Sequence, residues 1–152
     1  MRTAVAIALL SILGMGCTDD RPIASLRAMS EGTMYYPDSK VVKEVATPQV
    51  DSPDGKSGAS FGHLMGANAS PEEIVAFYHR ELRARGWRPI DAATGTGALT
   101  QAAWTNGQAD FTLFINRPER STPDIQQALV GYSIEYDARV EQIYPPPSAS
   151  QP

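Results

Sequence analysis

The hydrophobic pattern of the chain is clearest in residues 70–87, which predict one amphipathic helix. At about 100° per residue, the apolar residues of this stretch fall on one helix face. They are Ile74, Val75, Phe77, Tyr78 and Leu82. The other face carries His79, Arg80 and Arg83 and is predicted to meet solvent.

Both ends of this helix carry the signals that start and stop helices. Ser70 is placed to be the N-cap, and Glu73, three residues later, completes a capping box. Gly86 is placed at the left-handed position after the last turn, which lets Trp87 pack back on Leu82. The chain therefore predicts a helix with sharp boundaries.

Strands are predicted on both sides of the helix. Residues 40–46 and 59–65 precede it, and residues 47–58 between them have the Pro and Gly content of a loop. After a Thr- and Gly-rich loop at 92–98, Asn106-Gly107 marks a hairpin tip of type I′ with Trp104 opposite Ala109. A polar loop at 116–124 leads to a last alternating strand at 129–140.

The order of these elements is β-β-α-β-β-β. It predicts an α+β domain over residues 35–141, with an antiparallel sheet of about five strands and one main helix packed on one face. The expected core consists of Ile74, Phe77, Tyr78, Leu82, Trp87, Trp104, Phe111, Leu113, Ile134 and Tyr136.

The first 16 residues predict a signal peptide. Arg2 is followed by an apolar run at 4–13, about half of what a membrane span needs, and then by small residues before Cys17. Cys17 is the only cysteine, so it has no internal disulfide partner. This pattern resembles the lipobox of bacterial lipoproteins, although Gly14 stands where such boxes usually carry Leu. The alternative is an ordinary cleaved signal followed by a chance cysteine.

The lipobox resemblance implies that Cys17 is lipidated and becomes the new N-terminus, so that the partner is a membrane. Thr18 after the cysteine resembles a signal for the outer membrane, on its periplasmic side. In a bacterium with one membrane the protein would stand on the outer face of the cytoplasmic membrane. Residues 17–34 are expected to form a flexible tether, although Ile23, Leu26 and Met29 fall at helical spacing and allow a short helical turn. Residues 142–152 are expected to form a disordered, Pro-rich tail.

A second resemblance covers the predicted domain. Tyr36-Pro37-Asp38-Ser39, the segment SPEEIVAFYHREL and the pair Gly86-Trp87 resemble the pattern of small bacterial envelope proteins of uncharacterised function. The resemblance implies a fold and a compartment, and it implies no activity.

Candidate catalytic chemistry is limited to one short motif. Residues 58–62 match the G-x-S-x-G pattern around Ser60, with His63 beside it. A nucleophile elbow needs a strand before the serine, a helix directly after it and a parallel sheet, and the predicted elements supply none of this. His63 and His79 have no metal-ligand spacing, and we expect no metal or cofactor.

A basic cluster near the end of the predicted helix is the candidate anion site. It consists of His79, Arg80, Arg83, Arg85 and Arg88. Positive charge at a helix C-terminus complements the helix dipole, and this is the simpler interpretation. The alternative is a site for lipid headgroups, a cell-wall polymer or an acidic partner.

The charge balance argues against nucleic acid as a partner. The net charge of −4 becomes −5 once Arg2 is removed, whereas nucleic-acid binding needs a basic footprint. We expect a lipid-anchored protein of the cell envelope that acts as a non-catalytic binding or assembly module on an envelope protein or cell-wall polymer. The alternatives are a small hydrolase using Ser60 and His63, or a carrier of an apolar ligand with a cavity between helix and sheet.

Overall fold

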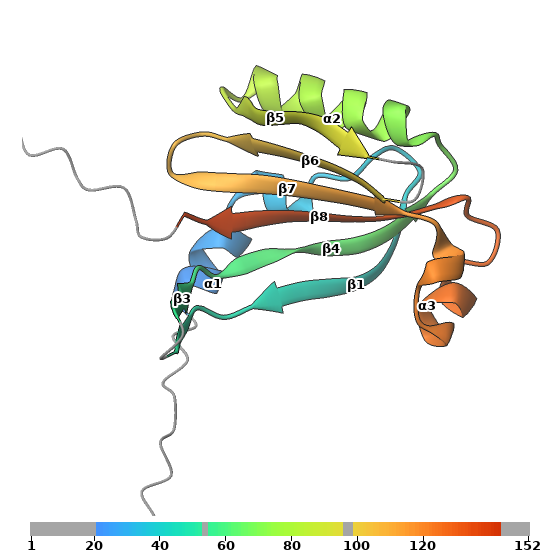
Figure 1. Ribbon diagram of the computed structural model, residues 1–152, viewed down its shortest axis with the longest axis horizontal. Coiled ribbons are helices and arrows are strands. Elements are labelled where there is room, and N and C mark those ends of the chain that lie inside the picture. Colours follow the sequence, from blue (N-terminus) through green and yellow to red (C-terminus); the bar gives the residue numbers. More distant parts are fainter. Residues whose placement is uncertain (1–20, 53–54, 96–98, 144–152) are drawn as a thin grey trace, which may run out of the picture.

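A computed structural model describes residues 21–52, 55–95 and 99–143 of the chain. The predicted α+β class is confirmed: the described part holds one antiparallel sheet of six strands, together with helices (Figure 1). The strand order is β1-β4-β8-β7-β6-β5, with a separate small β2–β3 hairpin. The expected strand number and order were therefore wrong in detail.

The elements follow one another along the chain with short connections. They are α1 (Arg21–Arg27), a 3-10 turn η1 (Ser30–Thr33), β1 (Lys40–Thr47), β2 (Val50–Ser52), β3 (Gly55–Ser57), β4 (Ser60–Ala67), α2 (Pro71–Ala84), β5 (Arg88–Gly95), β6 (Leu99–Thr105), β7 (Ala109–Asn116), a second 3-10 turn η2 (Pro118–Arg120), α3 (Pro123–Ala128) and β8 (Ile134–Gln142).

The main core lies on the sheet face that α1, η1 and α2 cover. It joins Leu26 of α1 and Ile74 of α2 to Phe61, Phe111 and Tyr136 of the sheet. All of the predicted core residues are buried except Phe77, which is partly buried and packs against the cluster. A smaller cluster of Leu64, Ile125 and Leu129 lies on the opposite face, under α3 at one end of the sheet (Figure 1).

The predicted ends of α2 are confirmed. The Ser70 hydroxyl accepts a hydrogen bond from the Glu73 N–H at 3.2 Å, and the Glu73 carboxylate accepts one from the Ser70 N–H at 2.7 Å. Gly86 has a φ of 86°, and the Trp87 N–H returns to the Leu82 carbonyl at 3.0 Å. These bonds satisfy backbone groups that a helix end otherwise leaves unpaired.

The predicted register of the β6–β7 hairpin is wrong by two residues. Trp104 lies opposite Phe111 rather than Ala109, and the turn residues are Gly107 and Gln108. Gly107 alone of these two has positive φ, as in a type II′ turn. The cause is Asn106, whose side-chain oxygen accepts hydrogen bonds from the N–H groups of Gln108 and Ala109, each at 2.8 Å.

Several segments expected as loops are regular structure. β5 occupies part of the expected 92–98 loop, and its Pro89 and register shifts are tolerated because it is an edge strand. β2 and β3 lie within the expected 47–58 loop. α3 occupies the end of the expected 116–124 loop and the residues just after it, and the expected 129–140 strand begins only at Ile134, as β8, after Gly131 reverses the chain with a φ of 90°.

The expected flexible tether at 17–34 is wrong over its described part. Residues 21–27 form α1 and residues 30–33 form η1. Leu26 is buried against the sheet, and the Gly32 carbonyl lies 3.0 Å from Nδ1 of the buried His63. The described fold therefore includes residues before Tyr35, where the domain was expected to begin. Residues 1–20 and 144–152, which include the expected signal peptide, Cys17 and most of the expected tail, lie outside the described residues.

Candidate functional site

A groove of about 410 Å³ lies between α1 and the strand ends of the main sheet. Helix α1 forms one wall, and the β6–β7 turn with the end of β8 forms the other. In Figure 1 these elements gather at the end of the molecule where the described chain begins and ends. The lining residues are Pro22, Ser25, Leu26, Met29, Gln108, Ala109 and Gln142.

Helical spacing explains how α1 supplies its wall. Pro22, Ser25, Leu26 and Met29 recur at i, i+3, i+4 and i+7, so that they form one stripe along the helix and the turn after it. Leu26 is only 5% exposed and forms the base of the stripe, whereas Ser25 lies exposed at its rim. The sequence signal was the helical spacing of Leu26 and Met29, in a segment expected to be a tether.

Strand pairing fixes the opposite wall. Ala109 of β7 lies directly opposite Gln142 of β8, and Gln108 belongs to the turn before β7. The Gln142 side-chain oxygen is already occupied, because it accepts a hydrogen bond from the Ala59 N–H at 3.3 Å.

The chemistry of the groove suits an apolar occupant. None of its lining residues is titratable, and Pro22, Leu26, Met29 and Ala109 present only carbon and sulfur. Apolar pockets with a few polar groups at the rim are typical of sites for small apolar ligands. The polar groups of the lining are the Ser25 hydroxyl and the side-chain amides of Gln108 and Gln142.

The structure does not bring Ser60 and His63 together. Both belong to β4, where an odd sequence separation puts side chains on opposite faces of the sheet. His63 lies on the main-core face, where its ring packs edge-on against Tyr35 and Phe61. The distances between the ring centroids are 5.3 and 5.5 Å. Its packing and its bond to Gly32 make His63 a part of the core.

The residues of the basic cluster separate into different roles. His79 was expected to be solvated, but it is partly buried, and its Nδ1 accepts a hydrogen bond from the Trp104 indole at 3.3 Å. Arg80 and Arg85 both pair with Glu81, at 3.1 and 3.6 Å. One carboxylate therefore offsets part of the charge of two guanidinium groups, although exposed pairs contribute little stability.

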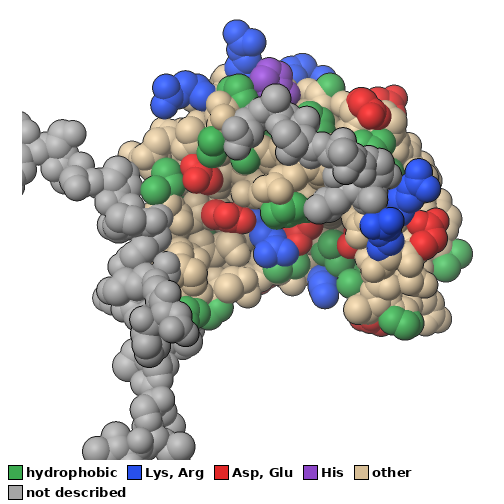
Figure 2. All heavy atoms as spheres, in the orientation of Figure 1, with side chains coloured by type: hydrophobic (Ala, Val, Ile, Leu, Met, Phe, Trp, Pro, Cys, Tyr) green, Lys and Arg blue, Asp and Glu red, His purple; other side chains and the backbone are tan. Residues whose placement is uncertain are grey.

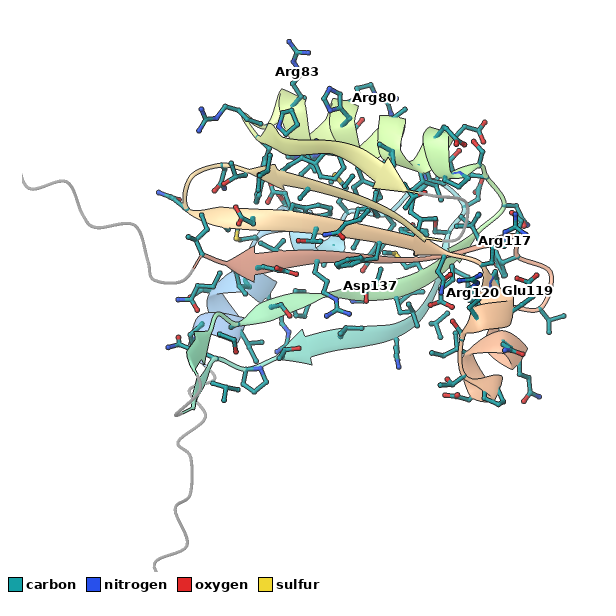
Figure 3. All side chains as sticks on the ribbon, in the orientation of Figure 1. Arg80, Arg83, Arg117, Glu119, Arg120 and Asp137 are labelled. Atoms are coloured by element: carbon teal, nitrogen blue, oxygen red, sulfur yellow. The ribbon has the colours of Figure 1, made fainter. Side chains whose placement is uncertain are left out.

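The remaining arginines of this cluster are exposed. Arg83 points outward from α2, on the side away from the sheet, and Arg88 begins β5 (Figure 3). Figure 2 shows Lys, Arg and His side chains along the α2 edge of the molecule. The positive character of this edge remains, and none of these residues lines the groove beside α1.

The open face of the sheet carries a group of charges that the sequence analysis did not single out. Arg139 pairs with both oxygens of Asp137 on its own strand, and Asp110 lies directly opposite Glu141. Asp137 is labelled in Figure 3. Burial raises the pKa of Glu141, and the negative charges of Asp110 and Asp137 raise it further. A hydrogen bond with Thr112 and the positive charge of Arg139 offset part of this rise in the pKa. The only signal in the sequence was the alternation of charged positions along the last strand.

Comparison of the chain with protein-family models, characterised proteins and solved structures gives no match. Within residues 21–143, as far as they are described, no helix is both long and apolar enough to cross a membrane. The same residues contain no group of three or more acidic, His or Cys side chains that could hold a metal ion.

Proposed function

We propose that the protein is a lipid-anchored binding or assembly module of the bacterial cell envelope, attached through Cys17. The observation that carries the proposal is the lone cysteine directly after an apolar run with a basic start. The absence of titratable side chains from the groove lining supports a binding role over a catalytic one.

The position of α1 gives this proposal a spatial consequence. Only residues 18–20 separate Cys17 from the first residue of α1. A trans peptide chain spans at most about 3.6 Å per residue, so the domain would stand within about 15 Å of the lipidated residue. The α1 end of the domain would then face the bilayer, and the basic edge of α2 would remain available to an envelope protein or a cell-wall polymer.

Fractionation of the native host tests the anchor. Wild-type protein should sediment with membranes and incorporate labelled fatty acid, because two or more acyl chains give stable anchoring where one gives only marginal binding. Cys17→Ser should abolish the label and leave the protein unprocessed or soluble. Arg83→Ser, a change on the exposed side of α2, is the control and should leave the label intact. Unlabelled wild-type protein in the soluble envelope fraction would contradict the proposal.

A carrier of an apolar ligand is the second candidate function, and the groove beside α1 is the observation that favours it. The interface between α2 and the sheet, where a carrier cavity was expected, is instead occupied by Tyr78, Trp104 and Phe111, all at most 2% exposed. The α1 groove is therefore the site that this alternative proposes for a free ligand.

A further inference from the structure

We infer that the groove beside α1 is the binding site for an acyl chain of the protein's own lipidated Cys17. This inference rests on the lipid anchor proposed above, and it assigns an occupant to the groove. It follows from three features of the described residues: the apolar lining, the place where the chain enters the domain, and the short distance to Cys17.

The first feature is the match between the groove and an aliphatic chain. A volume of about 410 Å³ lies within the range of small-molecule sites. Leu26 and Met29 supply the apolar floor, and the flexible thioether of methionine adapts to irregular shapes. Without a titratable lining residue, the groove offers no counter-charge to an anionic or cationic ligand.

The second feature is the entry point of the chain. Arg21 is the first residue of α1, and its neighbour Pro22 already lines the groove. The segment that carries Cys17 therefore joins the domain at the groove itself. An acyl chain attached to Cys17 could therefore reach the groove without crossing another part of the domain.

The third feature is the length of the connection. Cys17 and Pro22 are five residues apart, a span of at most about 18 Å. A ligand held by so short a linker has an effective concentration in the millimolar range. The protein's own acyl chain therefore has an advantage over any free lipid of ordinary concentration. A triacylated cysteine would still keep two chains for the bilayer, which is what stable anchoring requires.

The test uses the processed chain, residues 17–152, in which Cys17 is the only thiol. One sample is alkylated with N-dodecylmaleimide and a matched sample with N-ethylmaleimide. Both are titrated with the fluorescent fatty acid cis-parinaric acid at concentrations where both are monomeric. We expect the ethyl form to bind the probe saturably at one site. The dodecyl form should bind it about a hundredfold more weakly, because its own chain occupies the groove at millimolar effective concentration.

Paired variants of the ethyl form locate the binding site. Met29→Asp adds a charge to the groove, whereas Ala28→Asp adds the same charge to the exposed neighbouring residue. Ser25→Phe fills the rim, whereas Ala24→Phe adds the same ring to an exposed position that does not line the groove. Probe affinity should fall at least tenfold in the first member of each pair and stay within twofold in the second. Thermal unfolding of each variant establishes that it is folded.

The outcomes separate this inference from the anchor proposal. Absent or groove-independent probe binding would overturn the inference, whether or not Cys17 is lipidated in cells. Equal probe binding by the dodecyl and ethyl forms would also overturn it and would favour a carrier of a free apolar ligand. A Cys17 that takes up no labelled fatty acid in cells would remove the natural occupant and refute the anchor, while the maleimide experiment would still report on the groove.

Discussion

Gly62 of β4 is a position where the close pairing with β8 leaves no room for a side chain. A Cβ at this position would lie inside the van der Waals distance of the Ala138 carbonyl oxygen on β8 and 2.7 Å from the Arg139 Cα. Both atoms belong to the backbone, so the strands would have to separate. We expect Gly62→Ala to lower the free energy of unfolding by about 3 kcal/mol, at the upper end of overpacking effects. Urea denaturation measures the loss.

Gly86 supplies the control for this substitution. Its φ is positive, but a Cβ added there would have no neighbouring atom within 4 Å, so only conformational strain opposes a side chain. Asparagine tolerates this conformation, and Gly86→Asn should cost less than about 1 kcal/mol. A loss at Gly62 no larger than the loss at Gly86 would contradict the close pairing of β4 with β8.

Tyr78 makes the stability of the protein depend on pH in the alkaline range. Its hydroxyl donates a hydrogen bond to the Met34 carbonyl at 2.8 Å in a fully buried position. Burial raises its pKa well above 10, and the neighbouring Tyr136 raises it further. A pKa raised by folding means that the stability is complete below the unfolded pKa of about 10 and is lost as the pH rises above it.

The corresponding variant is Tyr78→Phe. At neutral pH it should lose about 1–3 kcal/mol, because the buried Met34 carbonyl loses its donor. Above pH 10 its stability should fall less steeply than that of the wild type. Urea midpoints between pH 8 and 11 give the comparison, and Tyr136→Phe is expected to flatten the decline as well, since burial raises the pKa of Tyr136 too. Identical slopes for Tyr78→Phe and the wild type would refute the assignment.

Among the elements, α2 depends most on interactions between residues that are close in the sequence. Its cap depends on Ser70 and Glu73, which are three residues apart and bond to each other in both directions. Ser70→Ala should lower stability by about 0.5–2 kcal/mol, whereas Ser70→Asp keeps an acceptor and should lose little. Circular dichroism during thermal unfolding provides the measurement. An unchanged midpoint for Ser70→Ala would place the start of the helix elsewhere.

The same locality explains which elements the sequence predicted. The caps and periodicity of α2 lie within residues 70–87, so the local pattern was enough to predict them. The hairpin register was missed because a shift of two residues leaves Trp104 and Phe111 on the same face, so the alternation cannot distinguish the two pairings. β5 was missed because its second half lies in the Thr- and Gly-rich stretch that was expected to be a loop. Pro89 is also unusual within a strand, although an edge strand accepts it.

The groove could not be predicted because its walls are distant in the sequence. Leu26 and Gln142 line the same groove because the folded sheet places the end of β8 beside α1, and no local pattern in the sequence connects them. The helical spacing of Leu26 and Met29 was visible in the sequence, but the sequence did not show that the ends of β7 and β8 lie beside them. The candidate site is therefore a property of the tertiary fold, whereas Cys17 is a property of the sequence alone.

At the scale of the whole molecule, the segment before β1 completes the core. Leu26 and Met34 are buried, the Gly32 carbonyl bonds to His63, and the Trp87 indole donates to Glu31 at 3.3 Å. The total free energy of unfolding of such a domain is about 5–15 kcal/mol. We therefore expect the contacts of this segment to contribute a large share of the stability.

A pair of truncations tests this boundary. A chain that starts at Tyr35, where the sequence placed the domain, should lose at least about 3 kcal/mol, because the loss of one buried leucine alone costs about that much and buried polar groups would lose their partners. A chain that starts at Arg21 should keep the stability of the processed protein, because it retains α1 and η1. Urea denaturation and the yield of soluble protein compare the two. Equal stability of both chains would mean that α1 and η1 rest on the sheet without supporting it.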